Sequence, residues 1–358
     1  MSFSAIHPFD LPELPPKAIG NNETFHKELL RARTELAELK GYSSSLPNPM
    51  LLLSPAIIKE SVASSEIENI NTTVEKVLQQ QLFPETEQKP EDKEVLRYKN
   101  AVITGFEQLS RIPLSNRLIL SIHKQLLGNR SHGYRTNQNR IENSNTHEVL
   151  YTPPPANEIP RLISNWEKYL NNQDDGIDPL IKCAVSHYQF EAIHPFSDGN
   201  GRAGRILMVL YLVQEELLHN PILYISGYIN RNRSQYYRLL RRVTTEENWY
   251  DFIEYMLKGF YLQAKETKGQ LLKVKELFYQ YKAEIKKECH GIYTGDLVET
   301  MFSLPIITPV RLGNLMGIHY TTATRYLKQL TEKKFLEHQQ LGKYQLYINK
   351  KLIAILKG

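Results

Sequence analysis

Cysteine, long apolar runs and internal repeats are scarce or missing in this chain. Only Cys183 and Cys289 occur among 358 residues, and they have no metal-ligand spacing. A disulfide framework is therefore not expected, whereas a reducing cytoplasm is. No apolar run approaches the roughly 18 residues of a membrane helix. The start, MSFSAIHPFDLPELPPK, lacks the basic region and apolar core of a signal peptide. We therefore expect a cytoplasmic protein with no membrane partner.

Most of the chain also has no net charge. The formal net charge is +5, and residues 296–358 carry nine basic and four acidic residues, so residues 1–295 balance to zero. A nucleic-acid or other anionic partner is therefore expected to meet the C-terminal end. The hydrophobic content of 41% is typical of a folded protein, and the length predicts two or three domains.

Apolar residues at helical spacing predominate, which predicts a mainly α fold. A helix with the sequence GRILMVLYLVQEELL is apolar on almost every side and is expected to be buried centrally. Residues 128–158 are rich in asparagine and end near three consecutive prolines, so a long loop or hairpin is expected there. The other expected helices cover residues 22–40, 55–67, 71–82, 94–109, 115–127, 159–171, 178–192, 232–242 and 247–287.

Residues 194–205, HPFSDGNGRAGR, bring together the residue types that phosphate chemistry requires. His194 can take a proton near neutral pH and could act as a general base toward an attacking hydroxyl. Asp198 can offer a hard carboxylate oxygen to Mg²⁺. Phe196 is expected to bury its ring and anchor the loop. Any one of these residues alone would be an ordinary turn residue, but their combination in this order predicts a phosphate site.

The second half of this run leads into the apolar helix. Gly199, Asn200 and Gly201 can turn their backbone N–H groups toward an anion at the helix start, where the first donors are unpaired. Arg202 and Arg205 are three residues apart and share one helix face. Two arginines at this place suit a polyphosphate better than a single phosphate.

The run resembles the Fic family signature, HPFx[D/E]GNGRxxR, at every fixed position. The resemblance implies a protein adenylyltransferase, which transfers AMP from ATP to a hydroxyl side chain and releases pyrophosphate. It implies that His194 is the general base and that Asp198 holds Mg²⁺. The implied ATP-binding residues of the motif are Gly199, Asn200, Gly201, Arg202, Ala203, Gly204 and Arg205, the last at the γ-phosphate.

Two further segments resemble parts of this family. Residues 145–155, NTHEVLYTPPP, look like its flap hairpin, which docks a target segment by strand addition. The docking strand would contain Val149, Leu150 and Tyr151. Residues 224–240 resemble the segment beside the adenine, with Asn232, Tyr236 and Tyr237 as the binding residues.

Residues 64–69, SSEIEN, match the family's inhibitory pattern, [S/T]xxxE[G/N]. Ser64 and Glu68 are four residues apart, on one face of a presumed helix. The resemblance implies that Glu68 pairs with Arg205 and occupies the guanidinium that the γ-phosphate needs. The pattern is short, Glu66 is a competing acid, and a solvated helix carboxylate is the plainer alternative.

Residues 296–358 are expected to form a winged helix-turn-helix domain. A short helix with Leu312 and Leu315, a turn at Gly317, a second helix and a hairpin with its tip at Gly342 follow in that order. The second helix carries threonines, Arg325 and other basic residues that suit DNA. Winged helices also bind proteins or dimerise, so DNA and a protein partner, including a homodimer, stay open.

The predicted fold is thus a Fic-type helical core with a β-hairpin flap and a C-terminal winged helix. The expected divisions are an N-terminal helical region at 1–90 with the inhibitory helix, a catalytic core at 91–260, a connecting helix at 261–295 and the winged helix at 296–358.

The predicted function is AMP transfer to a Ser, Thr or Tyr hydroxyl of a target protein and of the chain itself, with Mg²⁺ as cofactor and inhibition through Glu68. One alternative is another phospho-transfer on the same scaffold, because the motif is expected to contact phosphates and not the nucleobase. The other is a DNA-binding regulator whose core only senses nucleotide. The intact His194 argues against the regulator, since a sensor needs no base.

Overall fold

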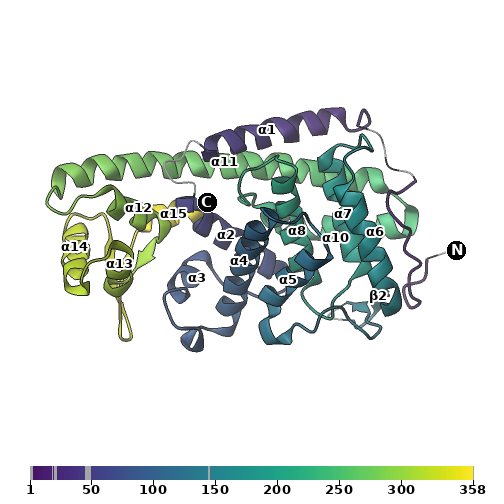
Figure 1. The fold of residues 1–358 in the computed structure, drawn as a ribbon, viewed down its shortest axis with the longest axis horizontal. Coiled ribbons are helices and arrows are strands. Elements are labelled where there is room, and N and C mark those ends of the chain that lie inside the picture. Colours follow the sequence, from purple (N-terminus) through teal and green to yellow (C-terminus); the bar gives the residue numbers. More distant parts are fainter. Residues whose placement is uncertain (1–2, 18, 20–21, 45–49, 144–145, 358) are drawn as a thin grey trace. The chain divides into compact units, whose positions relative to one another are not determined.

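A computed structural model describes residues 3–17, 19, 22–44, 50–143 and 146–357 of the chain. The fold is 65% helical with few strands, which confirms the predicted class (Figure 1). Every helix predicted between residues 22 and 287 is present, with ends that differ by a few residues. In the described part of the chain, no helix is long and apolar enough to cross a membrane.

The chain divides into two compact units. The first contains Met1–Ala37 and Arg97–Ala264, and the second contains Glu38–Leu96 and Lys265–Gly358. Three helices pass from one unit to the other: α1 (His26–Ser44), α4 (Pro90–Leu109) and the 40-residue α11 (Trp249–Glu288). The domain divisions predicted after residues 90, 260 and 295 stay predictions.

The first unit is a helical core with a small hairpin. Its elements are α5 (Asn116–Leu127), η2 (Gly128–Arg130), β1 (Ile141–Glu142), β2 (Val149–Tyr151), η3 (Ala156–Glu158), α6 (Ile159–Asn171), α7 (Pro179–Ile193), α8 (Asn200–Gln214), α9 (Ile225–Arg231) and α10 (Arg233–Glu246). Helix α7 packs against α6 and α8, and α5 packs against α8. Helix α9 was not predicted, because its seven residues are too few to show a period.

Helix α8 is buried along almost its whole length, as its sequence predicts. Residues 202–212 are all buried, and they include two arginines as well as the apolar side chains. Gly204 allows the close approach of α7, since a Cβ there would lie 2.5 Å from Glu191 Oε1 and 3.2 Å from the ring of Phe190. The loop between α7 and α8 is therefore held by two tightly packed helices.

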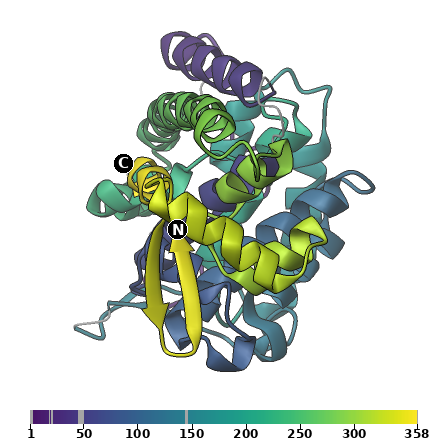
Figure 2. The same cartoon turned by 90° about the vertical axis from the view of Figure 1, so that its left-hand side faces the viewer.

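The second unit contains the helix that carries the predicted inhibitory residues and the predicted winged helix. Its elements are α2 (Met50–Ile67), α3 (Val74–Gln80), η1 (Glu85–Glu87), α12 (Gly295–Ser303), β3 (Ile306–Ile307), α13 (Pro309–Met316), α14 (Tyr320–Glu332), β4 (Glu337–Leu341), β5 (Tyr344–Ile348) and α15 (Lys350–Lys357). The three strands form an antiparallel sheet in the order β3-β5-β4. Figure 2 shows the β4–β5 hairpin in yellow, with its tip at Gly342.

The helix-turn-helix expected in the C-terminal region is present. Thr308 accepts a hydrogen bond from the backbone of Arg311 at the start of α13, and Gly317 ends that helix in the left-handed conformation with φ of 64°. Helix α14 follows and presents Ala323, Leu327 and Leu330 to the core. The predicted order of short helix, turn, second helix and hairpin corresponds to α13, Gly317, α14 and β4–β5, whereas α12, β3 and α15 were not predicted.

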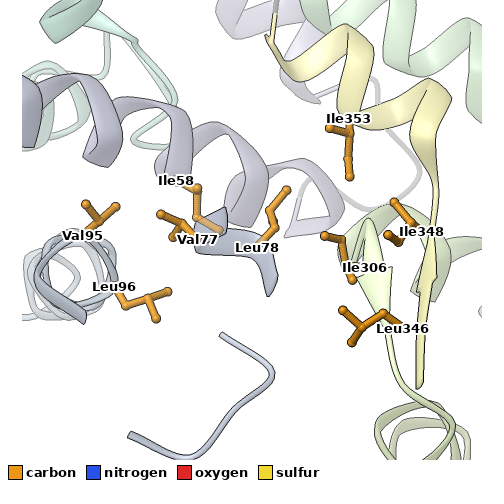
Figure 3. Packing of buried hydrophobic residues seen from close by; sticks show 9 residues of the cluster. All are labelled: Ile58, Val77, Leu78, Val95, Leu96, Ile306, Leu346, Ile348 and Ile353. Carbon is orange, nitrogen blue, oxygen red and sulfur yellow. The ribbon is translucent and has the colours of Figure 1, made fainter. Parts of the chain in front are cut away.

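One apolar cluster joins these C-terminal elements to α2, α3 and the start of α4. Figure 3 shows its side chains, which come from α2, α3, α4, β3, β5 and α15. Helix α12 packs along α2, and α15 contacts both α2 and α3. The C-terminal elements and α2 therefore share one core. The buried members of this cluster are Ile58, Val77, Leu78, Val95, Leu96, Ile306, Leu346, Ile348 and Ile353.

Polar contacts reinforce the same packing at its edge. Glu75 on α3 accepts hydrogen bonds from Lys350 (2.9 Å) and Lys357 (2.5 Å), and these lower the pKa of its carboxyl. At the β4–β5 hairpin, Glu87 accepts from Lys343 (2.8 Å) and from the Tyr344 hydroxyl (2.9 Å). Exposed ion pairs of this kind contribute little stability each, so the apolar cluster supplies most of the attachment.

Candidate active site

The loop with the predicted catalytic motif, residues 194–205, begins where α7 ends. Asp178 caps the first turn of α7 by accepting from Leu180 N–H (2.8 Å), and Pro179 occupies the first helical position. His194 is the C-cap residue, with φ of 48° and ψ of 58° in the left-handed region. A non-glycine residue there is strained by roughly 1–2 kcal/mol, so the surrounding contacts must hold it.

The hydrogen bond of the His194 ring indicates its tautomer. Nδ1 lies 3.3 Å from the carbonyl oxygen of Glu191, one turn back on α7. A carbonyl only accepts, so Nδ1 carries the proton in this contact and Nε2 is the basic nitrogen. The ring is half-buried and therefore reachable by a substrate. This arrangement is the one that a general base needs.

Asn200 closes the loop on itself. Its Oδ1 accepts from Phe196 N–H and its Nδ2 donates to the Phe196 carbonyl, both at 2.8 Å. Gly199 precedes it with φ of 82° as the N-cap of α8. The loop thus delivers the chain to the N-terminus of α8, whose first N–H groups can bind an anion. Phe196 is fully buried, as predicted.

His123 on α5 contacts the loop, and this contact was not predicted from the sequence. Its Nε2 lies 3.0 Å from the Asp198 carbonyl oxygen, and its Nδ1 lies 2.8 Å from Ser131 Oγ. The Nε2–H therefore donates to the carbonyl, and Nδ1 accepts from the hydroxyl. Burial lowers the pKa of His123 below its ordinary value.

Asp198 faces solvent beside two arginines. Its Oδ1 accepts from Arg202 Nη2 at 3.2 Å, and Arg130 Nη1 lies 3.7 Å from Oδ2. The side chain of Asp198 is 53% exposed, whereas that of Arg202 is 3% exposed. A partly exposed carboxylate has the hard oxygens and the access to solvent that Mg²⁺ requires. No cluster of three or more His, Cys, Asp or Glu residues with metal-binding geometry occurs among the described residues.

Arg205 is buried one turn further into α8. It is 1% exposed, and its charge affects two neighbouring groups, His187 on α7 and Tyr236 on α10. Burial, and next the charge of Arg205, lower the pKa of His187 to about 3. His187 Nε2 and the Tyr236 hydroxyl are hydrogen-bonded at 2.7 Å. His187 and Tyr236 therefore form a neutral, buried wall beside the arginine.

The three residues predicted beside the adenine lie in different environments. Asn232 links α9 to α10, and its side-chain Nδ2 donates to the Tyr228 carbonyl at 2.9 Å. Tyr236 is buried against His187, whereas Tyr237 is 46% exposed. Adjacent residues on a helix point about 100° apart, so the two tyrosines cannot have the same surroundings. Their role in adenine binding stays a prediction.

The hairpin predicted to be the flap is hydrogen-bonded to the end of α7, just before His194. Strand β2 pairs antiparallel with β1, with Ile141 opposite Tyr151 and Glu142 opposite Val149 across a register shift. Val149, Leu150 and Tyr151 are all half-buried. The Tyr151 hydroxyl donates to the Ala192 carbonyl at 2.9 Å, two residues before the histidine. Asn145, the first residue of the predicted flap, lies outside the described residues, and target docking stays a prediction.

The predicted inhibitory residues lie at the end of α2, in the second unit. Glu68 follows the helix, and its N–H donates to the Ser65 carbonyl at 3.0 Å. Asn69 has a left-handed φ of 62°, a common way to end a helix. Ser64 is buried in the last turn. Arg205 belongs to the first unit, so the pairing of Glu68 with Arg205 stays a prediction.

The fold and the loop define a Fic-domain protein. Residues 26–107 match the Fic/DOC family N-terminal domain, and residues 113–212 match the Fic/DOC family domain. Residues 277–352 match the "Protein adenylyltransferase SoFic-like, C-terminal domain". These matches follow one another along most of the chain, and they confirm the resemblance of its motif. The chain therefore belongs to the Fic/DOC family.

Curated relatives match part of the chain. It is 32% identical over 212 residues to a probable protein adenylyltransferase of Aquifex aeolicus. This alignment covers 56% of this chain and 58% of the relative. It is 28% identical over 152 residues to the protein adenylyltransferase Fic of Drosophila grimshawi. This alignment covers 41% of this chain and 28% of the relative. The match thus spans less than two thirds of either relative's length.

Solved structures show the same fold. A Fic family protein from Desulfovibrio desulfuricans aligns with a TM-score of 0.58 at 20% identity, and the alignment covers 93% of this chain and 98% of that one. Fic-1 of C. elegans aligns with a TM-score of 0.54 at 19% identity and covers 69% of this chain and 74% of that one. The first alignment includes nearly the whole of both chains, so the likeness extends beyond the helical core.

Proposed function

We propose that this chain is a protein adenylyltransferase that transfers AMP from ATP to a hydroxyl side chain of a target protein and of itself. The observation that carries the proposal is the position of His194. It stands at the start of the loop that enters α8, the helix with two buried arginines, and its Nε2 is the basic nitrogen. The names of the Aquifex aeolicus and Drosophila grimshawi relatives support the same activity. A Ser, Thr or Tyr hydroxyl fits this chemistry equally well.

In this reaction the hydroxyl oxygen attacks the α-phosphorus of ATP while His194 Nε2 takes its proton. The bond from the α-phosphorus to the bridging oxygen breaks, and pyrophosphate leaves with the electron pair. The N-terminus of α8, with Gly199, Asn200 and Gly201, is the proposed cradle for the phosphates. Arg202 binds their oxygens, and Arg205 holds the γ-phosphate. Positioning and charge neutralisation supply most of the catalysis.

Asp198 is the proposed Mg²⁺ ligand. Mg²⁺ commonly takes one or two carboxylates and fills its other positions with phosphate oxygens and water. A single exposed carboxylate beside a phosphate cradle fits that preference. The ion would offset the negative charge of the polyphosphate. The proposed contribution of the chain is to place Asp198 through the carbonyl contact with His123.

Glu68 is the proposed inhibitory residue, with Ser64 as its partner in the motif. A carboxylate that occupies the Arg205 guanidinium competes directly with the γ-phosphate. The turn after α2, fixed by three backbone hydrogen bonds and a left-handed Asn69, supports a defined direction for the Glu68 side chain. Glu66 is the competing acid in this segment, and it offers a matched control.

The test compares purified wild type, Glu68→Gly, Glu66→Gly and His194→Ala with Mg²⁺ and ATP labelled at either the α- or the γ-phosphate. The proposal expects protein-bound label from the α-phosphate only, raised by Glu68→Gly, unchanged by Glu66→Gly and abolished by His194→Ala. Label from the γ-phosphate would instead mean phosphorylation. No label in any variant that still binds ATP would favour a nucleotide sensor.

A binding role for the C-terminal domain is the second candidate. Helix α14 exposes Thr321, Arg325 and Lys328, and this charge favours DNA. Val310 and Leu315 on α13 are also exposed, which suits a protein partner such as a second copy of the chain. DNA affinity that falls steeply with salt would support DNA, and a concentration-dependent mass would support a homodimer. A cytoplasmic location is part of the proposal.

A further inference from the structure

A buried arginine outside the signature motif connects the flap to the catalytic loop. Arg135 is 5% exposed, and it lies in the loop that leads to β1. Its guanidinium donates to carbonyl oxygens of three separate segments. These bonds run from Nε to His194 (2.9 Å), from Nη2 to Pro154 (2.6 Å) and Ile193 (3.4 Å), and from Nη1 to Asn137 (3.2 Å).

These contacts meet a need that the backbone creates. Ile193 and His194 are the last residue and the C-cap of α7, and the final carbonyls of a helix have no partner within it. They also form the negative end of the helix dipole, so a guanidinium is favoured there. The left-handed conformation of His194 adds a local cost. One cation thus satisfies the helix end and holds the strained residue.

The neighbours of Arg135 extend the connection on both sides. Its own backbone N–H donates to the Pro195 carbonyl at 2.9 Å. Gln138 Nε2 donates to the Pro153 carbonyl at 2.8 Å, on the flap side. Asn139 Nδ2 donates to the Phe196 carbonyl at 3.3 Å, on the loop side. Residues 135–139 therefore connect the end of the flap to the start of the proposed catalytic motif by hydrogen bonds.

We propose that Arg135 is a positioning residue that fixes the backbone of His194 relative to the flap on which a target segment docks. The inference rests on the proposed adenylyl transfer. A target hydroxyl held by β2 and the base that deprotonates it must be aligned, and an error of about 1 Å between such groups can cost roughly a hundredfold in rate. Arg135 joins the two parts directly, through Pro154 on one side and His194 on the other.

Lysine cannot replace this arginine. A lysine keeps the positive charge, but its single ammonium lacks the planar fork that reaches carbonyls in three directions. Arg135→Lys therefore separates the geometry from the charge. Arg161 on α6 is the matched control, because it is an exposed arginine of the same unit whose Nε donates to Glu158 Oε2 at 2.8 Å.

The experiment measures AMP incorporation from α-labelled ATP by the full chain in a Glu68→Gly background. Arg135→Lys is expected to lower kcat roughly tenfold or more while the KM for ATP changes less than about twofold, because the nucleotide contacts lie in the α8 motif. Arg161→Lys is expected to leave both constants unchanged. Equal kcat values for Arg135→Lys and the reference would overturn the inference.

A second readout needs no turnover. The imidazole C–H signals of His194, assigned by comparison with His194→Ala, report the ring's conformation in solution. In Arg135→Lys we expect these signals to shift or broaden, whereas in Arg161→Lys they should stay in place. An unchanged His194 signal in a folded Arg135→Lys protein would refute the positioning role even if the proposed transfer activity itself were absent.

Discussion

The ring of Phe196 lies flat on the imidazole of His123, with ring centroids 3.6 Å apart and planes inclined by only 4°. The same imidazole donates to the carbonyl of Asp198, two residues further on. One buried side chain on α5 thus supports both an aromatic anchor and the backbone of the proposed metal ligand. Histidine combines the flat ring and the N–H donor that these two contacts require.

Replacing His123 should separate these two contacts. His123→Phe keeps a flat ring against Phe196 but removes the donor to Asp198, and His123→Ala removes both. We expect both variants to lose AMP transfer by roughly tenfold, because the Asp198 backbone loses its hydrogen bond. We expect His123→Ala to be less stable by about 2–3 kcal/mol in urea denaturation, and His123→Phe to recover part of this loss. Full activity in His123→Phe would show that stacking alone suffices.

His187 predicts how stability depends on pH. Burial and the charge of Arg205 lower its pKa to about 3 in the folded protein, whereas an unfolded chain has a pKa near 6.5. Between these values the unfolded state binds more protons, so the free energy of unfolding falls as the pH is lowered from about 6.5 toward 3. His187→Gln keeps a polar group near Tyr236 but does not titrate. Urea titrations at pH 7 and pH 5 should show a smaller loss for this variant, and equal losses would contradict the assignment.

Gly204 and Gly269 should respond to alanine in opposite directions. At Gly204 a Cβ would collide with Glu191 Oε1 and press on Phe190, between α7 and α8. We expect Gly204→Ala to cost roughly 1–3 kcal/mol of stability and to reduce AMP transfer. At Gly269 in α11 a Cβ meets no atom within 4 Å, so Gly269→Ala should gain about 0.5–1 kcal/mol. Midpoints of chemical denaturation measure both, and a stabilised Gly204→Ala would disprove the tight contact.

Leu346 tests whether the C-terminal core supports α2, the helix that leads to the proposed inhibitory residue Glu68. It is fully buried in the cluster that contains Ile58 of α2. Leu346→Ala should cost roughly 2–5 kcal/mol and loosen that packing. Because α2 leads to Glu68, we expect AMP self-modification to rise by about two- to tenfold, as measured with α-labelled ATP.

Leu315→Ala is the control for this experiment. Leu315 lies on α13 and is 52% exposed, so its truncation should change neither stability nor activity. Glu68→Gly sets the fully released level. If Leu346→Ala lowers stability but leaves self-modification at the wild-type level, the C-terminal core does not support inhibition.

Local sequence patterns predicted much of this fold. The helices up to residue 287 follow from apolar spacing, and the loop at 194–205 follows from residue types with few other uses together. The roles of His123 and Arg135 were not predicted, because each contacts the 194–205 loop through a backbone carbonyl more than 50 residues away along the chain. Every residue has a carbonyl, so such a contact leaves no pattern in the sequence.

The tyrosine pair shows a second limit. Tyr236 and Tyr237 were predicted to share one role, yet one is buried beside His187 and the other is largely exposed. The direction of each side chain depends on which face of α10 meets α7, and that is decided by tertiary packing. Helix α9 was missed for a different reason, because a helix of seven residues is too short to show an apolar period.

The shared core of α2 and the C-terminal elements has a consequence for any shortened form of this protein. A chain that stops before α12 would remove Ile306, Leu346, Ile348 and Ile353 and leave Ile58 and its neighbours on α2 and α3 facing water. Such a fragment would aggregate more readily, and α2, which leads to the proposed inhibitory residue Glu68, would lose its contacts with these four side chains. If Glu68 acts as proposed, proteolytic removal of the residues from α12 onward should therefore raise AMP self-modification and also shorten the lifetime of the protein.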